Sequence, residues 1–332
     1  MKYSDSYNQE LSNLLKHRSS ENCDNTQNVI KLECQNLSFG DYSVLIPYEE
    51  ISYPKTKDSR IGKGGFSTVY KADLFGSTWA VKKFSWNFSG VSALDFKDIQ
   101  SVVNEILIMN SLHHERILKL KACGFRIKQK KFSVKIVTEI MKCDLKQLIY
   151  SDHELTDEEK LNIALQTLYG IRYLHSRRIQ HLDLKPQNIL VNADHSEIKI
   201  ADFGISKANF QETKKTAIIG TTLVYSSREY AIENKVSPQK SDMWSYGAIL
   251  FELFAKRRPW GEWGNEEVKE FLINKEDFLE KSNGNLPKEI KEIITLCMKH
   301  NTEERISSEE LLKVFPRDIH GIYLKTIKSG IN

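Results

Sequence analysis

Cysteines and long apolar runs are scarce in this chain of 332 residues, and each scarcity excludes a class of protein. The cysteines are odd in number and lack C-x-x-C spacing, which argues against a disulfide framework and a structural zinc site. They are Cys23, Cys34, Cys123, Cys143 and Cys297. No segment offers the roughly 20 apolar residues of a membrane helix, and the first residues lack the apolar core of a signal peptide. We expect a soluble protein of a reducing compartment, the cytoplasm, with the nucleus as the alternative.

An excess of one charge is also lacking. The 48 basic and 44 acidic residues leave a net charge of +4, too little to indicate nucleic acid or an anionic membrane as the main partner. The basic run 128–131 is more simply a solvated hairpin tip. With 40% apolar and 28% charged residues, the composition is that of a globular protein. We expect neither nucleic-acid binding nor membrane insertion, and the oligomeric state stays open.

The chain changes character along its length. Residues 1–54 are mostly polar and predict a mobile or loosely docked extension. From Ser59 onward, short β-branched and aromatic segments separated by turn residues predict antiparallel strands. One helix is expected near residues 98–111, where Ile99, Val102, Ile106 and Met109 recur at helical spacing. Two further strands are expected at 118–125 and 132–140, and a mostly helical region follows Asp144.

A glycine-rich turn and a lysine are the first chemical signals. Gly62-Lys63-Gly64-Gly65 lies between two predicted strands, where glycine amides can approach anionic oxygens closely. Lys82 stands inside the apolar run of the next strand and needs a negative partner. Glu105, on the inward stripe of the predicted helix, is a natural partner. A plain hairpin and a structural ion pair would explain these features taken singly.

Two acids and an amide form the second signal. Asp183 and Asn188 lie in HLDLKPQNIL, and Asp202 lies in IKIADFG shortly after. Short turn-like segments can bring these groups together as a base and as hard oxygen ligands for Mg²⁺.

In this order, the motifs resemble the signature set of the eukaryotic protein kinase family, from about Arg60 to Leu312. The resemblance implies a two-lobed α+β fold, with a small antiparallel-sheet lobe, one key helix and a larger helical lobe. The kinase domain would cover 55–319, divided into an N-lobe at 55–138, a hinge at 139–143 and a C-lobe at 144–319. A tail would occupy 320–332.

The resemblance also implies a role for each motif residue. Lys82, held by Glu105, would contact the α- and β-phosphates of ATP. Asp183 would accept or orient the substrate hydroxyl proton, and Lys185 would offset charge on the moving phosphoryl group. Asn188 and Asp202 would hold Mg²⁺, with Mn²⁺ as a substitute. Residues expected to bind the nucleotide are Ile61, Gly62, Lys63, Gly64, Gly65, Val69, Ala80, Lys82, Thr138, Glu139, Met141, Asp144 and Leu190.

Three positions depart from the family pattern. Ser67 replaces the third loop glycine, Leu182 replaces the arginine of H-R-D, and Ser227-Arg228-Glu229 replaces A-P-E. That arginine normally pairs with a phosphorylated activation loop. We therefore expect activity to depend less on such phosphorylation. The segment before Glu229 is one residue longer than usual, so Thr221 and Thr222 compete for one family position. The resemblance pairs Glu229 with Arg305.

The leading hypothesis is a protein serine/threonine kinase that transfers the ATP γ-phosphoryl group to Ser or Thr hydroxyls, in intracellular signalling. Lys185-Pro186-Gln187-Asn188 matches the K-P-x-N of Ser/Thr kinases. The sequence resembles the tyrosine-kinase-like group most and Mos-type kinases more weakly. The alternative is a pseudokinase, a nucleotide-binding scaffold, because H-R-D and A-P-E are altered. A kinase of small molecules is less favoured because the activation segment is long.

Overall fold

The computed structural model describes residues 44–63, 67–87, 93–128, 131–204, 206–208, 220–233, 239–282 and 286–315. The chain forms two compact units. Unit 1 takes in the described residues up to Leu112 together with Lys119–Ile140, and unit 2 takes in His113–Leu118 and the described residues from Met141 onward. One unit is built on a sheet and the other mainly on helices, as the two-lobed α+β prediction requires.

Unit 1 is built on a five-stranded antiparallel sheet with the strand order β1-β2-β3-β5-β4. Alternating apolar and polar residues produce these strands, because successive side chains point to opposite faces. Val81 and Lys82 are therefore directed to opposite faces of the central strand. The strands are β1 (Arg60–Lys63), β2 (Ser67–Leu74), β3 (Ser77–Asn87), β4 (Leu120–Lys128) and β5 (Lys131–Glu139). Lys128 and Lys131 are paired and exposed at the β4–β5 end, where a hairpin tip was expected.

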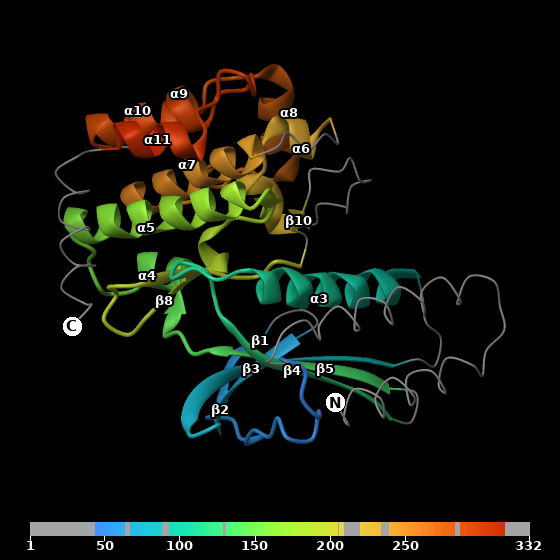
Figure 1. Ribbon diagram of the computed structural model, residues 1–332. Coiled ribbons are helices and arrows are strands. Elements are labelled where there is room, and N and C mark those ends of the chain that lie inside the picture. The colour runs from blue at the N-terminus through green and yellow to red at the C-terminus, as the bar shows by residue number, and fades with distance from the viewer. Residues whose placement is uncertain are drawn as a thin grey trace. The chain divides into compact units, whose positions relative to one another are not determined.

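The helix of unit 1, α3 (Ala93–Ser111), follows the predicted apolar stripe. Ile99, Val102, Ile106 and Met109 are all buried, and Glu105 is buried among them. Figure 1 shows α3 along one face of the sheet and the chain that precedes β1 along the other face. The sheet is therefore covered on both sides.

The chain before β1 is packed more firmly than the sequence predicted. Ile46 and Cys123 form a backbone hydrogen bond of 3.0 Å beside β4, and Tyr48 and Ile51 are almost fully buried. Ile51 joins a cluster of apolar side chains from the sheet: Ala72, Leu74, Val81, Ala122 and Val137. Residues 44–54 are thus part of the core of unit 1, because they cover a sheet face that would otherwise expose apolar side chains. Residues 1–43 lie outside the described part of the chain.

Unit 2 is centred on α7 (Lys240–Ala255), in which every residue from Ser241 to Phe254 is buried. A helix that is apolar on nearly every face needs such a central position. α7 packs against α5 (Asp157–Ser176) and α10 (Lys288–Cys297). None of the helices in the ranges given above is long and apolar enough to cross a membrane.

Unit 2 contains further helices, and its short strands all precede α6. On α5, the apolar residues Ala164, Leu165, Leu168 and Ile171 form one stripe and are buried, and Leu161 is half-buried. The remaining helices are α4 (Leu145–Ile149), α6 (Arg228–Ala231), α8 (Asn265–Asn274), α9 (Phe278–Ser282) and α11 (Ser308–Val314), with short 3₁₀ turns η1 (Pro186–Asn188) and η2 (Gly220–Tyr225). The short strands are β6 (Cys143–Asp144), β7 (Ile179–Gln180), β8 (Ile189–Val191), β9 (Ile198–Ile200) and β10 (Lys207–Ala208).

Candidate active site

The part of the candidate site in unit 1 is an ion pair between β3 and α3. Lys82 Nζ lies 2.8 Å from Glu105 Oε1, and the side chains are 23% and 6% exposed. The pairing predicted from the sequence is therefore present. The pair holds the lysine in one orientation on the α3 face of the sheet.

The other predicted nucleotide residues of unit 1 lie on β1, β2, β3 and β5 or directly after β1. Gly62 and Val69 are register partners between β1 and β2, and Ala80 and Thr138 are partners between β3 and β5. Ile61 is 46% exposed, whereas Ala80 and Thr138 are buried. Lys63 is exposed, and Glu139 accepts a hydrogen bond from the Lys119 amide at 2.7 Å. Gly64 and Gly65 lie outside the described residues.

The part of the candidate site in unit 2 is centred on Asp183. Its Oδ2 accepts hydrogen bonds from Lys185 Nζ at 2.7 Å and from Asn188 Nδ2 at 3.0 Å. The same amide donates to the Asp183 carbonyl at 2.8 Å, which ties η1 to the preceding loop. Asp183 Oδ1 is buried and has no hydrogen-bond partner among the described residues. The carboxylate is therefore fixed in orientation with one acceptor oxygen unused.

A buried acid at the start of α7 positions this loop. Asp242 accepts hydrogen bonds from the backbone amides of His181, at 2.9 Å, and Leu182, at 2.8 Å, and from the His175 ring at 3.0 Å. Burial acts to raise the pKa of Asp242, but the hydrogen bond and charge of His175 outweigh it and hold the pKa below its usual range. Neither Asp242 nor His175 is among the site residues predicted from the sequence. The sequence signal for Asp242 was an acidic residue in the first turn of an otherwise apolar helix.

Leu182 occupies the H-R-D arginine position with its side chain buried. Its φ of 64° is left-handed, an uncommon conformation for a non-glycine residue. The amides of His181 and Leu182 both reach Asp242, which compensates for this conformation. The apolar Leu182 side chain cannot form the ion pair that an arginine at this position forms with a phosphorylated activation loop.

The remaining predicted residues of unit 2 lie on or near short strands. Asp202 lies two residues after β9 with a φ of 68° and is half-buried, as are Leu190 in β8 and Met141 before β6. Asp144 caps α4, because its Oδ1 accepts the Gln147 amide at 2.9 Å. This contact already uses one carboxylate oxygen of the residue that was expected to reach the nucleotide. Burial and the nearby Asp144 charge raise the pKa of the Cys143 thiol, which favours an unreactive side chain.

The altered A-P-E segment is anchored at both ends. Glu229 and Arg305 form the predicted ion pair, and Arg228 binds Glu233. Tyr225, at the end of η2, donates to the buried Glu252 at 2.5 Å. Substitution of the usual alanine and proline therefore leaves the segment attached to the core of unit 2. The side chains of Thr221 and Thr222 lie outside the described residues.

Comparisons with known proteins agree with these motifs. Residues 55–315 match the family model of the protein kinase domain. The chain is 32% identical to the probable serine/threonine-protein kinase SIS8 of Arabidopsis thaliana over 243 residues, which are 72% of this chain and 22% of that protein. It is 35% identical to mitogen-activated protein kinase 15 of Oryza sativa subsp. japonica over 202 residues, which are 58% of this chain and 39% of that protein. The chain thus spans less than half the length of the curated relatives it matches. The motifs and the family match together show that the chain belongs to the protein kinase family.

Proposed function

We propose that this chain is a protein serine/threonine kinase, an ATP:protein phosphotransferase acting on Ser and Thr hydroxyls. The observation that carries the proposal is the hydrogen bonding of the Asp183 carboxylate. Lys185 and Asn188 hold one carboxylate oxygen, while the other is buried and has no partner among the described residues. An acceptor at this place can take a hydrogen bond from a substrate hydroxyl and orient it for attack.

Two lysines would offset charge on the phosphates. Lys185 donates to Asp183 and would also face the phosphoryl group as it moves. Lys82 is held by Glu105, so its ammonium would reach the nucleotide phosphates in a defined direction. Phosphoryl transfer requires little covalent participation by the protein, so positioning and electrostatics of this kind would supply most of the rate.

The residues of unit 2 fit a divalent metal of the Mg²⁺ class. The Asn188 amide nitrogen is used by Asp183, which leaves the side-chain carbonyl oxygen as its possible metal ligand. Asp202 supplies a second hard oxygen, and oxygen ligands are what Mg²⁺ prefers. When bound with ATP, the metal would neutralise charge between the phosphates. Asn188 and Asp202 are therefore the proposed ligands, with Mn²⁺ as the natural substitute.

Protein substrates with Ser or Thr acceptors are favoured over the pseudokinase alternative. The Lys185-Pro186-Gln187-Asn188 run is of the Ser/Thr type, and the relatives named above are Ser/Thr and mitogen-activated protein kinases. These names also support a role in signalling. A scaffold would not need the Lys82–Glu105 pair, Asp183, Asn188 and Asp202 together.

The test is phosphate transfer from ATP with Mg²⁺ to a generic Ser/Thr protein and to the chain itself. The Asp183→Asn variant should lose transfer, whereas Asp58→Asn, a change of an exposed aspartate before β1, should retain it. Nucleotide binding is measured in parallel on all three proteins. Binding without transfer by the unaltered chain would overturn the proposal and support the scaffold alternative.

A further inference from the structure

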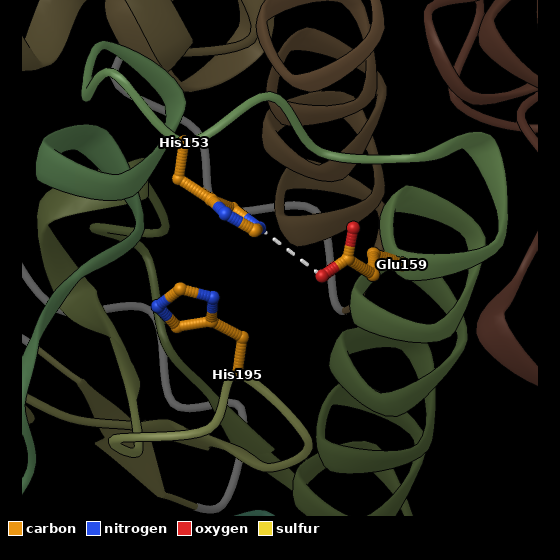
Figure 2. A group of neighbouring side chains, drawn as sticks. All are labelled: His153, Glu159 and His195. Carbon is orange, nitrogen blue, oxygen red and sulfur yellow. Dashed lines mark hydrogen bonds and ion pairs between the residues drawn. The ribbon is translucent and has the colours of Figure 1, made fainter.

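Three side chains capable of binding a metal meet in unit 2, on elements that the kinase motifs do not use. His153 lies in the loop between α4 and α5, Glu159 in the first turn of α5, and His195 in the turn between β8 and β9. One ligand atom from each lies within 4.8 Å of the other two. Figure 2 shows the two imidazole rings one beside the other, with the Glu159 carboxylate next to them. No other such group of three occurs within the described ranges.

Glu159 and His153 are held in place by local hydrogen bonds. Glu159 Oε2 accepts the amide of Thr156 at 2.8 Å in a capping box, while Oε1 pairs with His153 Nε2 at 3.2 Å. The His153 amide donates to Ser151 Oγ at 3.3 Å. These bonds orient the Glu159 carboxylate toward the His153 ring.

The turn that carries His195 is attached to the same helix as Glu159. Gln166 of α5 donates to the Ser196 carbonyl at 2.8 Å and accepts the Ile198 amide at 3.1 Å. These two bonds fix the end of the turn directly after His195. The ligand elements are therefore placed by the fold before any ion binds, which lowers the ordering cost of binding.

Two imidazoles and one carboxylate form a ligand set of the zinc class. Zinc lies about 2.0–2.1 Å from such ligands, so tetrahedral ligand atoms are separated by about 3.3 Å. The His153–Glu159 separation of 3.2 Å already meets this requirement. The rings of His153 and His195 have centroids 4.7 Å apart and planes inclined at 58°. A small rotation of the His195 ring would bring its nitrogen into range.

We propose that His153, Glu159 and His195 bind one Zn²⁺-class ion, with water completing the coordination. Nitrogen ligands favour such ions over Mg²⁺ and Ca²⁺, which prefer oxygen. Asp152, Glu154 and Asp194 are sequence neighbours of the two histidines and make the surroundings more favourable to a cation. The bound ion would join the α4–α5 loop, α5 and the β8–β9 turn.

The test is titration of the chelator-treated chain of 332 residues with Zn²⁺, followed by calorimetry, and with Co²⁺, followed by absorption. We expect one site with the visible d–d bands of a nitrogen and oxygen environment and no thiolate-to-cobalt charge-transfer band. His153→Gln and Glu159→Gln should each weaken binding by at least about tenfold, the minimum commonly seen even for partners of metal ligands. His113→Gln, a change of an exposed histidine, should leave binding unchanged.

The variants are chosen to preserve the fold. Glutamine at position 159 can keep the capping hydrogen bond while losing the charge. His195→Asn suits a φ of 60°, because asparagine tolerates the left-handed region. Circular dichroism and thermal unfolding without metal establish that each variant is folded. The proposal is overturned if metal binding is absent, if it survives all three substitutions, or if cobalt reports a thiolate ligand.

Discussion

Arg305 and Glu229 form a two-pronged ion pair inside unit 2. Nη1 lies 2.6 Å from Oε1 and Nη2 lies 3.0 Å from Oε2, and the arginine side chain is fully buried. Arg305 also donates to the carbonyls of Lys299 and Lys240. The pair thereby joins the altered A-P-E segment to the chain before α11 and to the start of α7.

Breaking this pair from one side should be costly. Arg305→Met leaves the buried Glu229 carboxylate without its cation, and we expect the free energy of unfolding to fall by about 3–5 kcal/mol. The matched control is Arg172→Met, because Arg172 and Glu309 are also 2.6 Å apart but are 48% and 56% exposed. That change should cost less than about 1 kcal/mol. Equal losses in urea denaturation would contradict the dependence on burial.

The anchoring of Asp242 should make stability sensitive to acid. The pKa of Asp242 is lower in the folded chain than in the unfolded chain, where the pKa of an aspartate is about 3.9. Below that pH the unfolded state binds more protons, so this contribution to stability is lost as the pH falls through the folded pKa. Asp242→Asn should be less stable at neutral pH and should lose less stability on acidification. Urea midpoints measured across the acidic range test this, and parallel curves for the two proteins would contradict it.

Tyr225 should matter more than Tyr150, although both donate to Glu252. Tyr225 Oη lies 2.5 Å from Glu252 Oε2 and is buried, whereas Tyr150 donates at 3.0 Å and is 43% exposed. Burial raises the pKa of Glu252, and the two hydroxyls partly offset that effect. Tyr225→Phe should lower the free energy of unfolding by about 1–3 kcal/mol, and Tyr150→Phe by about 1 kcal/mol or less. The reverse order in chemical denaturation would argue against the role given to burial.

Lys135 should make unit 1 more stable at alkaline pH. Burial lowers the pKa of Lys135 to about 8, whereas the pKa of a lysine in the unfolded chain is about 10.4. Between these values the unfolded state binds more protons, so stability rises with pH in that window. Lys135→Met should lack this rise, and Lys131→Met, on the exposed end of the same strand, should keep it. Denaturation from pH 7 to 10.5 makes the comparison, and a rise retained in Lys135→Met would contradict the assignment.

The same lysine should hold the chain before β1 in place. Its Nζ donates to the carbonyls of Tyr48, at 2.9 Å, and Ile51, at 2.5 Å. Lys135→Met removes both bonds, so the Ile46 amide, which pairs with Cys123, should exchange its hydrogen faster. Exchange at β3 amides serves as the internal reference. Unchanged exchange at Ile46 would show that apolar contacts alone dock this segment.

Lys185 should be needed for the proposed phosphoryl transfer. Lys185→Met removes one charge from the place where Asp183 is oriented, and we expect kcat to fall by about 10²–10³ while nucleotide binding remains. Lys269→Met changes an exposed lysine on α8 and should have no effect. A Lys185→Met variant with unaltered turnover would remove this residue from the mechanism.

Local patterns in the sequence were sufficient to predict the strands and helix of unit 1 and the motif residues of the candidate site. The stripe through Ile106 predicted α3 and the inward position of Glu105, because helical periodicity is a property of neighbouring residues. The ordered motifs around Asp183 and Asp202 indicated the family for the same reason. The hydrogen bond from the Leu182 amide to Asp242 could be found only in the structure, because a backbone amide can donate whatever side chain its residue carries.

The sequence by itself determined the strands and helix of unit 1, the mainly helical character of unit 2 and the motifs that they carry. Only the tertiary structure decided which distant residues share a site or a core. The polar chain before β1 was predicted to be a mobile or loosely docked extension. In the structure, Lys135 donates hydrogen bonds to two of its carbonyls, and Ile51 lies in the core of unit 1. His153, Glu159 and His195 carry no motif and meet only because α5 holds the β8–β9 turn. Contacts between distant segments depend on packing, and local periodicity contains no information about them.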